Sequence, residues 1–104
     1  MASANYTIIR GAMERRQQIV CVYQGHQREI CPHCIGASKD GGEQMLGYQF
    51  AGGSSKGLPP GGEWRCLDVG QLRDVRARDG EWHTGDSHLA PQSCVKQVDF
   101  EIRG

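Results

Sequence analysis

Apolar residues near the start of the chain recur at helical spacing. Pairs four residues apart, such as Ile9 and Met13, form one apolar stripe. The pattern predicts a short helix over residues 6–16, and Ser3 or Asn5 can cap its first turn. A helix of about three turns needs tertiary contacts to persist, so we expect its apolar stripe to pack on the rest of the chain.

After Gln18 the apolar period changes to two, which is typical of β-strands. The predicted strands cover residues 19–23, 28–35, 45–50, 64–69, 72–78 and 95–102. Glycine-containing turns separate them, and the clearest hairpin signal is Lys-Asp-Gly-Gly at residues 39–42. These elements predict a mainly β fold, a small closed or half-closed β-barrel of about five to six strands with a short N-terminal helix.

The length of the chain predicts one domain over residues 1–104. Residues 81–104 form a C-terminal extension that ends in the last predicted strand.

The 12 basic and 12 acidic residues cancel to a net charge of +0. A neutral chain has no field with which to hold a phosphate backbone indiscriminately, so nucleic acid is a disfavoured partner. No apolar run approaches the roughly 20 residues that span a bilayer, and the N-terminus lacks the pattern of a secretory signal. We therefore expect a cytoplasmic protein without membrane association, whose five cysteines are reduced thiols.

The longest irregular segment, residues 51–62, is rich in glycine and serine. Within it, Ser54, Ser55 and Lys56 can supply hydroxyl and ammonium donors to an anion, and the glycines let backbone N–H groups converge. A flexible hairpin loop explains the composition equally well, and the spacing is not that of a Walker phosphate loop.

The most specific pattern covers residues 65–75, Arg-Cys-Leu-Asp-Val-Gly-Gln-Leu-Arg-Asp-Val. Together with the helix, the strand ending at Tyr23, Arg28, residues 32–36 and Leu46, it resembles the WYL domains of bacterial transcription regulators. The resemblance covers residues 6–80 and rests on hydrophobic patterns. It implies an SH3-like or Sm-like β-barrel that binds small ligands or nucleic-acid fragments in a partly basic groove.

Two features differ from the family pattern. Gln44-Met45-Leu46 stands where the family has Trp-Tyr-Leu, so only the leucine matches. The predicted helix begins at residue 6, so we also expect the helix-turn-helix that precedes the domain in the family to be missing. The resemblance therefore implies the fold more strongly than the function, and we expect a stand-alone WYL-like domain.

Cys31-Pro32-His33-Cys34 has the cysteine spacing of zinc knuckles and redox dithiols. Residues three apart on a strand point to opposite faces, so a chelate needs a break at Pro32. Further ligands would have to come from scattered positions, namely Cys66, His83, His88 and Cys94. We therefore favour buried thiols that pack as small hydrophobes and expect no cofactor, with structural zinc on Cys31 and Cys34 as the alternative.

The segment around His83, Asp86 and His88 poses a similar choice. These side chains suit a metal or acid–base cluster, and a surface loop explains them equally well.

Arg65 shares the strand parity of Leu67, so its stem points inward. An inward arginine needs a partner, because burying an unpaired charge is costly. Glu63 has the same parity and can be that partner, and a bound carboxylate or phosphate would serve equally. Arg28, beside Glu29, raises the same question.

Polar residues thus gather around the connection between the third and fourth strands. We predict a non-catalytic domain that binds a small anionic or nucleotide-like ligand, because no nucleophile–base set is recognisable in the sequence. The predicted ligand-binding residues are His33, Gln49, Ser54, Ser55, Lys56 and Arg65. The alternatives are a structural or interaction module that forms a homodimer or binds a separate protein through the edge strand 95–102, and a zinc-stabilised domain.

Overall fold

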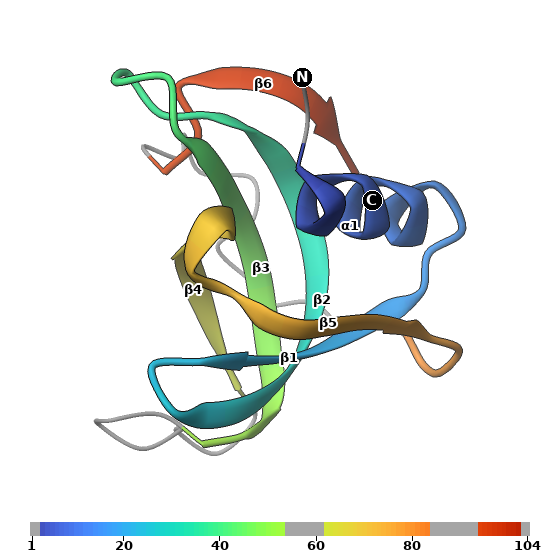
Figure 1. The fold of residues 1–104 in the computed structure, drawn as a ribbon. Helices are drawn as coiled ribbons and strands as arrows, with labels where there is room; N and C mark the ends of the chain where they lie inside the picture. Colours follow the sequence, from blue (N-terminus) through green and yellow to red (C-terminus); the bar gives the residue numbers. More distant parts are fainter. Residues whose placement is uncertain (1–2, 54–61, 84–93, 103–104) are drawn as a thin grey trace.

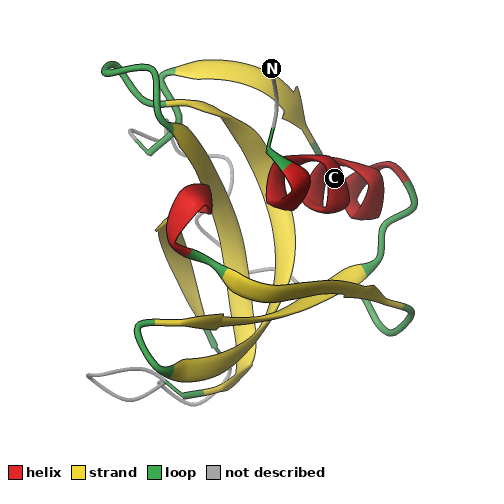
Figure 2. Cartoon of the chain, in the orientation of Figure 1, coloured by secondary structure: helices red, strands yellow, loops and turns green. Residues whose placement is uncertain are grey.

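The computed structural model describes residues 3–53, 62–83 and 94–102. The elements follow in the order α1 (Ala4–Glu14), β1 (Gln18–Tyr23), β2 (His26–Ala37), β3 (Glu43–Gly52), β4 (Glu63–Asp68), the 3-10 turn η1 (Val69–Gln71), β5 (Arg73–Arg78) and β6 (Gln97–Glu101). Figure 2 shows the short helix beside the curved strands. The predicted mainly β fold with a short N-terminal helix is therefore confirmed.

All six strands belong to one antiparallel sheet in which β4, β3, β2, β1 and β5 are neighbours in that order, and β6 pairs with β2 outside this path. The long strand β2 pairs with β1 along its first half and with β6 along its last residues (Figure 1). Among the described residues β4 and β5, the end strands of this order, do not pair. The sheet is curled but open between them, and η1 connects the two strands across the opening.

Helix α1 begins where the sequence offers an N-cap. The Ser3 hydroxyl accepts a hydrogen bond from the Tyr6 N–H at 3.2 Å, as predicted for one of the two candidate caps. Asn5 has another role: its amide donates to the carbonyls of Val69 (3.2 Å) and Leu72 (2.9 Å) and so holds η1 against the helix. In the described part of the chain, no helix is long and apolar enough to cross a membrane.

The helix ends at Glu14, two residues earlier than predicted. Arg16 adopts a left-handed conformation with φ 53°, and the Gln17 N–H bonds back to the Ala12 carbonyl at 2.8 Å. This is a Schellman cap, in which glycine normally occupies the left-handed position. Sequence pattern alone did not indicate it because that position holds arginine.

The apolar stripe of α1 completes the core. Its buried residues Ile9, Ala12 and Met13 belong to one cluster with side chains from the strands and η1. The other members of this cluster are Ile19, Cys21, Ile30, Ile35, Met45, Leu67, Val69, Leu72, Val75 and Ile102. Burying a side chain the size of isoleucine contributes about 1.5–3 kcal/mol, so docking on the sheet is what keeps so short a helix formed.

The cysteines do not all behave as predicted. Cys66 of β4 and Cys94, which precedes β6, form a disulfide with a Cα–Cα distance of 5.6 Å, so the expectation of five reduced thiols is wrong for this pair. The two residues are 28 positions apart, and only the tertiary fold brings them together. Cys21, Cys31 and Cys34 are free and buried, as expected for thiols that pack as small hydrophobes.

Reduction of the Cys66–Cys94 disulfide is expected to lower the free energy of unfolding by roughly 3–4 kcal/mol, because the bond closes a loop with a sequence separation of 28. Urea unfolding with and without dithiothreitol measures the difference. The double variant Cys66→Ser/Cys94→Ser is the control, and dithiothreitol should leave its stability unchanged. Equal stability of the oxidised and reduced wild type would contradict this account.

A tight turn joins β1 to β2. Tyr23 pairs with His26, so the turn contains only Gln24 (φ 53°) and Gly25 (φ 79°). Two consecutive residues with positive φ make a type I′ turn, whose twist matches the strands it joins. Glycine adopts this conformation at little cost, whereas Gln24 does so under strain.

Gln24→Asn is expected to raise the free energy of unfolding by about 0.5–1 kcal/mol, because asparagine tolerates the left-handed region and Asn-Gly is the preferred type I′ pair. Thermal or urea unfolding measures the change. Gly25→Ala is the opposite control: its Cβ would meet nothing within 4 Å, so a loss of about 1 kcal/mol would report backbone strain alone.

Candidate functional site

A buried glutamine lies at the centre of a polar cluster inside the curled sheet. Gln49 of β3 is 0% exposed. Its Oε1 accepts hydrogen bonds from Nη1 of Arg28 at 3.3 Å and from Nε of Arg65 at 3.2 Å. Its Nε2 donates to the carbonyls of Ala51 (3.1 Å) and Gly53 (3.0 Å). The two backbone acceptors fix the amide so that one neutral oxygen faces both guanidinium groups.

Strand register explains why the two arginines converge on this oxygen. Arg28 of β2 and Arg65 of β4 flank β3 on opposite sides, and both pair with glycines of that strand, Gly52 and Gly47 respectively. A Cβ at either glycine would collide with β2, so both positions require a residue without a side chain.

Arg28 carries a buried charge. It is 3% exposed, and its Nε is buried without a hydrogen-bond partner. Its guanidinium lies 5.1 Å from the centre of the Tyr23 ring, and none of the described carboxylates pairs with it. Burial, and after it the neighbouring charge of Arg65, lowers the pKa of Arg28 below its usual value. Among the described residues, this buried cation therefore has no carboxylate that neutralises it.

Arg65 is compensated. Its Nη2 forms an ion pair with Oε2 of Glu63 at 3.1 Å, so the partner predicted from strand parity is confirmed. The cluster of Arg28, Gln49, Arg65 and Glu63 thus contains two positive charges and one negative charge. We call these four residues the arginine cluster.

The structure brings together two of the predicted ligand-binding residues, Gln49 and Arg65. It places His33 elsewhere: the His33 ring contacts Trp64 (4.7 Å between ring centres) and Trp82 (4.9 Å). Trp64 and Arg65 are adjacent on β4, so their side chains project to opposite faces of the strand. Ser54, Ser55 and Lys56 lie outside the described residues.

His33 is part of a packed interior. It is 2% exposed, and its Nδ1–H donates to the Cys31 carbonyl at 2.7 Å. The pairing of β2 with β3 shifts register between Pro32 and Cys34, which places His33 in an irregularity of the strand. This break at Pro32 is the one that a Cys31–Cys34 chelate would need.

No metal centre is assembled around it, however. In residues 3–53, 62–83 and 94–102, no three His, Cys, Asp or Glu side chains are grouped so that they could hold a metal ion. The Cys31 sulfur instead accepts a hydrogen bond from the His83 N–H at 3.2 Å, and the His83 ring stacks on Phe50 at 4.1 Å. Burial raises the pKa of the Cys34 thiol to about 11, which favours the neutral thiol over the thiolate that binds metals. Asp86 and His88 lie outside the described residues.

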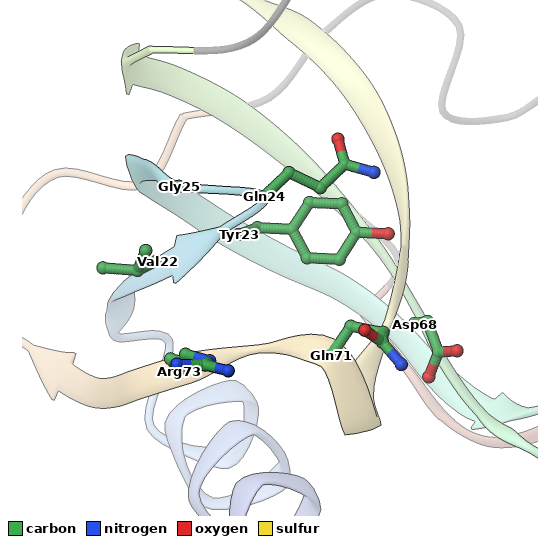
Figure 3. Close-up of a pocket in the computed structure, with 7 residues that line it drawn as sticks. All are labelled: Val22, Tyr23, Gln24, Gly25, Asp68, Gln71 and Arg73. Carbon is green, nitrogen blue, oxygen red and sulfur yellow. The ribbon is translucent and has the colours of Figure 1, made fainter.

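A cleft of about 530 Å³ opens next to the arginine cluster. Residues of the β1–β2 turn line one side, and residues from the end of β4 to the start of β5 line the other (Figure 3). The lining residues are Val22, Tyr23, Gln24, Gly25, Asp68, Gln71 and Arg73. Tyr23 connects the two features, because its ring contacts Arg28 and also lines the cleft.

Sequence reasoning missed the cleft because its two sides are far apart in the chain. For Arg28 the signal was present: it shares strand parity with the buried Ile30, as Arg65 does with Leu67. No comparable signal exists for Gln71 or Arg73, whose position depends on how η1 crosses the open side of the sheet.

Comparison with models of known protein families, with curated proteins and with solved structures finds no match for this chain.

Gln49→Leu is expected to lower the free energy of unfolding by about 3 kcal/mol or more, because Arg28 loses its one hydrogen-bond acceptor among the described residues and two carbonyls lose their donor. Urea unfolding monitored by tryptophan fluorescence measures the loss. Gln44→Leu is the matched control on the same strand, and it should change stability by less than about 1 kcal/mol because Gln44 lies outside the arginine cluster. Similar losses for both variants would remove the central role assigned to Gln49.

Proposed function

We propose that this chain is a non-catalytic domain that binds a small oxyanion, a carboxylate or a phosphate group, at the arginine cluster. The observation that carries the proposal is the uncompensated charge of Arg28, which is 3% exposed. A buried charge is normally neutralised by a partner, and an anionic ligand would supply the partner that the described residues do not.

The chemistry of the cluster suits this role. Guanidinium groups present planar, fixed donors that match the geometry of carboxylate and phosphate oxygens. Gln49 holds both groups in place, so little ordering would be needed when an anion binds. Gly53, which anchors the Gln49 amide, directly precedes Ser54, and the predicted anion donors Ser54, Ser55 and Lys56 remain part of this proposal.

The resemblance to WYL domains fits the same proposal. The resemblance implies a module that senses a small anionic or nucleotide-like ligand. On the same interpretation, the domain has an SH3-like arrangement of strands and is located in the cytoplasm. The Cys66–Cys94 disulfide speaks against the cytoplasmic location, because disulfides are rare in cytosolic proteins and persist in oxidising compartments.

Self-association through the edge strand β6 is a second candidate. It is favoured by Val98 of β6, which is 48% exposed and is one of two large hydrophobic side chains that are exposed among the described residues. A dimer in native mass spectra that Val98→Lys converts to a monomer would support it.

Arg28→Met is expected to abolish oxyanion binding and leave the ligand-free protein as stable as the wild type or more stable, because methionine fills a similar space without a buried charge. Isothermal titration with phosphate, sulfate and succinate measures binding, and urea unfolding measures stability. At 100 times its dissociation constant, a bound anion should stabilise the wild type by about 2.7 kcal/mol.

Arg76→Met is the matched control, since Arg76 is an exposed arginine of β5 that does not belong to the cluster. It should leave anion binding unchanged. Two results would contradict the proposal: wild type that binds none of the three anions, or an Arg28→Met variant that is strongly destabilised and still binds them.

A further inference from the structure

The charges of the arginine cluster do not balance. Arg28 and Arg65 are positive, and among the described residues only the carboxylate of Glu63 pairs with either of them. Because Gln49 is neutral, the cluster has a surplus of a single positive charge. One singly charged anion would neutralise it, whereas a doubly charged anion would leave a negative charge in a largely buried site, which is unfavourable.

The carboxylate of Glu63 lies close to the centre of the cluster. In the register of β3 and β4, Glu63 is directly opposite Gln49, and its Oε2 is 3.1 Å from Nη2 of Arg65. Residues directly opposite each other in an antiparallel sheet are close neighbours on one face. A second negative charge near the Gln49 amide would therefore be repelled by Glu63, and burial strengthens this repulsion.

The accessible end of the cluster is the one that carries this negative charge. The side chain of Glu63 is 47% exposed and that of Arg65 is 18% exposed, whereas Arg28 as a residue is 3% exposed. Across β3 from Glu63, Arg28 occupies the buried end. An anion that reaches Arg28 from the β4 side thus passes Glu63 first.

Arg28 has hydrogen-bond donors left for such an anion. Its Nη1 donates to Gln49, and its Nε and Nη2, which share another edge of the guanidinium plane, form no hydrogen bond with the described residues. The Tyr23 ring lies 5.1 Å from the guanidinium carbon. Two parallel N–H groups on one edge match the two oxygens of a carboxylate.

We infer that the arginine cluster selects a singly charged carboxylate over a doubly charged phosphate or sulfate, and that Glu63 determines this specificity. The inference rests on the proposed function and narrows its ligand to one class. The carboxylate would bind the remaining edge of Arg28 while Glu63 stays paired with Arg65. A dianion would need the charge of Arg65 as well, and Glu63 already neutralises that charge, so Glu63 discriminates by repulsion.

The test compares two anions of similar tetrahedral shape and different charge, methanesulfonate with one negative charge and sulfate with two. Acetate adds the planar carboxylate. NMR titration at constant ionic strength measures the three dissociation constants, and the Nε–H signals of Arg28 and Arg65 locate the site. The wild type should bind methanesulfonate and acetate at least about tenfold more tightly than sulfate, because Glu63 repels the second charge.

Glu63→Gln removes the charge and keeps the size of the side chain. The variant should remain folded, because an ion pair as exposed as this one contributes little to stability. Its gain in affinity should be at least about tenfold larger for sulfate than for methanesulfonate, since removing a nearby negative charge favours a dianion about twice as much in free energy as a monoanion.

Glu14→Gln is the matched control. Glu14 forms an ion pair of the same length, 3.1 Å, with Arg10 and is 54% exposed, but it lies on α1 outside the arginine cluster. This variant changes the net charge of the protein by the same amount as Glu63→Gln. It should leave the ratio of the sulfate and methanesulfonate affinities within about twofold of the wild type, because charges that are exposed and distant are screened.

Two results would overturn the inference while the proposed function stands. One is a wild type that binds sulfate as tightly as methanesulfonate, and the other is a ratio of the two affinities that is the same in Glu63→Gln and the wild type. If neither the wild type nor Glu63→Gln binds any of the three anions, the proposed function itself fails and the inference fails with it.

Discussion

The amide of Gln49 is the interaction on which the interior of this domain depends. Gln49 lies on the central strand of three, and its oxygen binds an arginine from each neighbouring strand. Its Nε2 donates to the carbonyls of Ala51, near the end of β3, and of Gly53, just after it. A hydrophobic residue at this position would leave Arg28 and two carbonyls without partners in an environment that penalises unpaired polar groups. The polar cluster therefore links the positions of β2, β3 and β4 to one side chain.

The same arrangement has a cost. Burial of Arg28 opposes its charge, and the proximity of Arg65 adds to the penalty, so the pKa of Arg28 is lowered. Glu63 pairs with Arg65, whereas the described partners of Arg28 are a neutral oxygen and an aromatic ring. Proteins commonly place such unfavourable groups where a ligand binds, because the ligand then relieves the penalty. This imbalance is why the arginine cluster, rather than the more exposed ion pairs, is the candidate site.

The open side of the sheet places a cleft beside the arginine cluster. Because β4 and β5 do not pair in the described part of the chain, η1 crosses between them and the β1–β2 turn faces it across a cleft. Asn5 fixes η1 from the helix side, and the Cys66–Cys94 disulfide ties β4 to the segment before β6.

The sequence by itself determined the features that depend on near neighbours. Periodicity located the helix and all six strands, Ser3 was one of two recognisable candidate caps, and the parity of β4 made Glu63 a candidate partner of Arg65. Features that join distant residues were decided by the tertiary structure alone. The disulfide between Cys66 and Cys94, the convergence of Arg28 and Arg65 on Gln49, and the cleft between Tyr23 and Arg73 all depend on strand register and on the path of η1. His33 shows the difference most clearly: its place in the chain suggested the anion site, but its ring packs against Trp64, on the other face of β4 from Arg65, because side chains alternate along a strand.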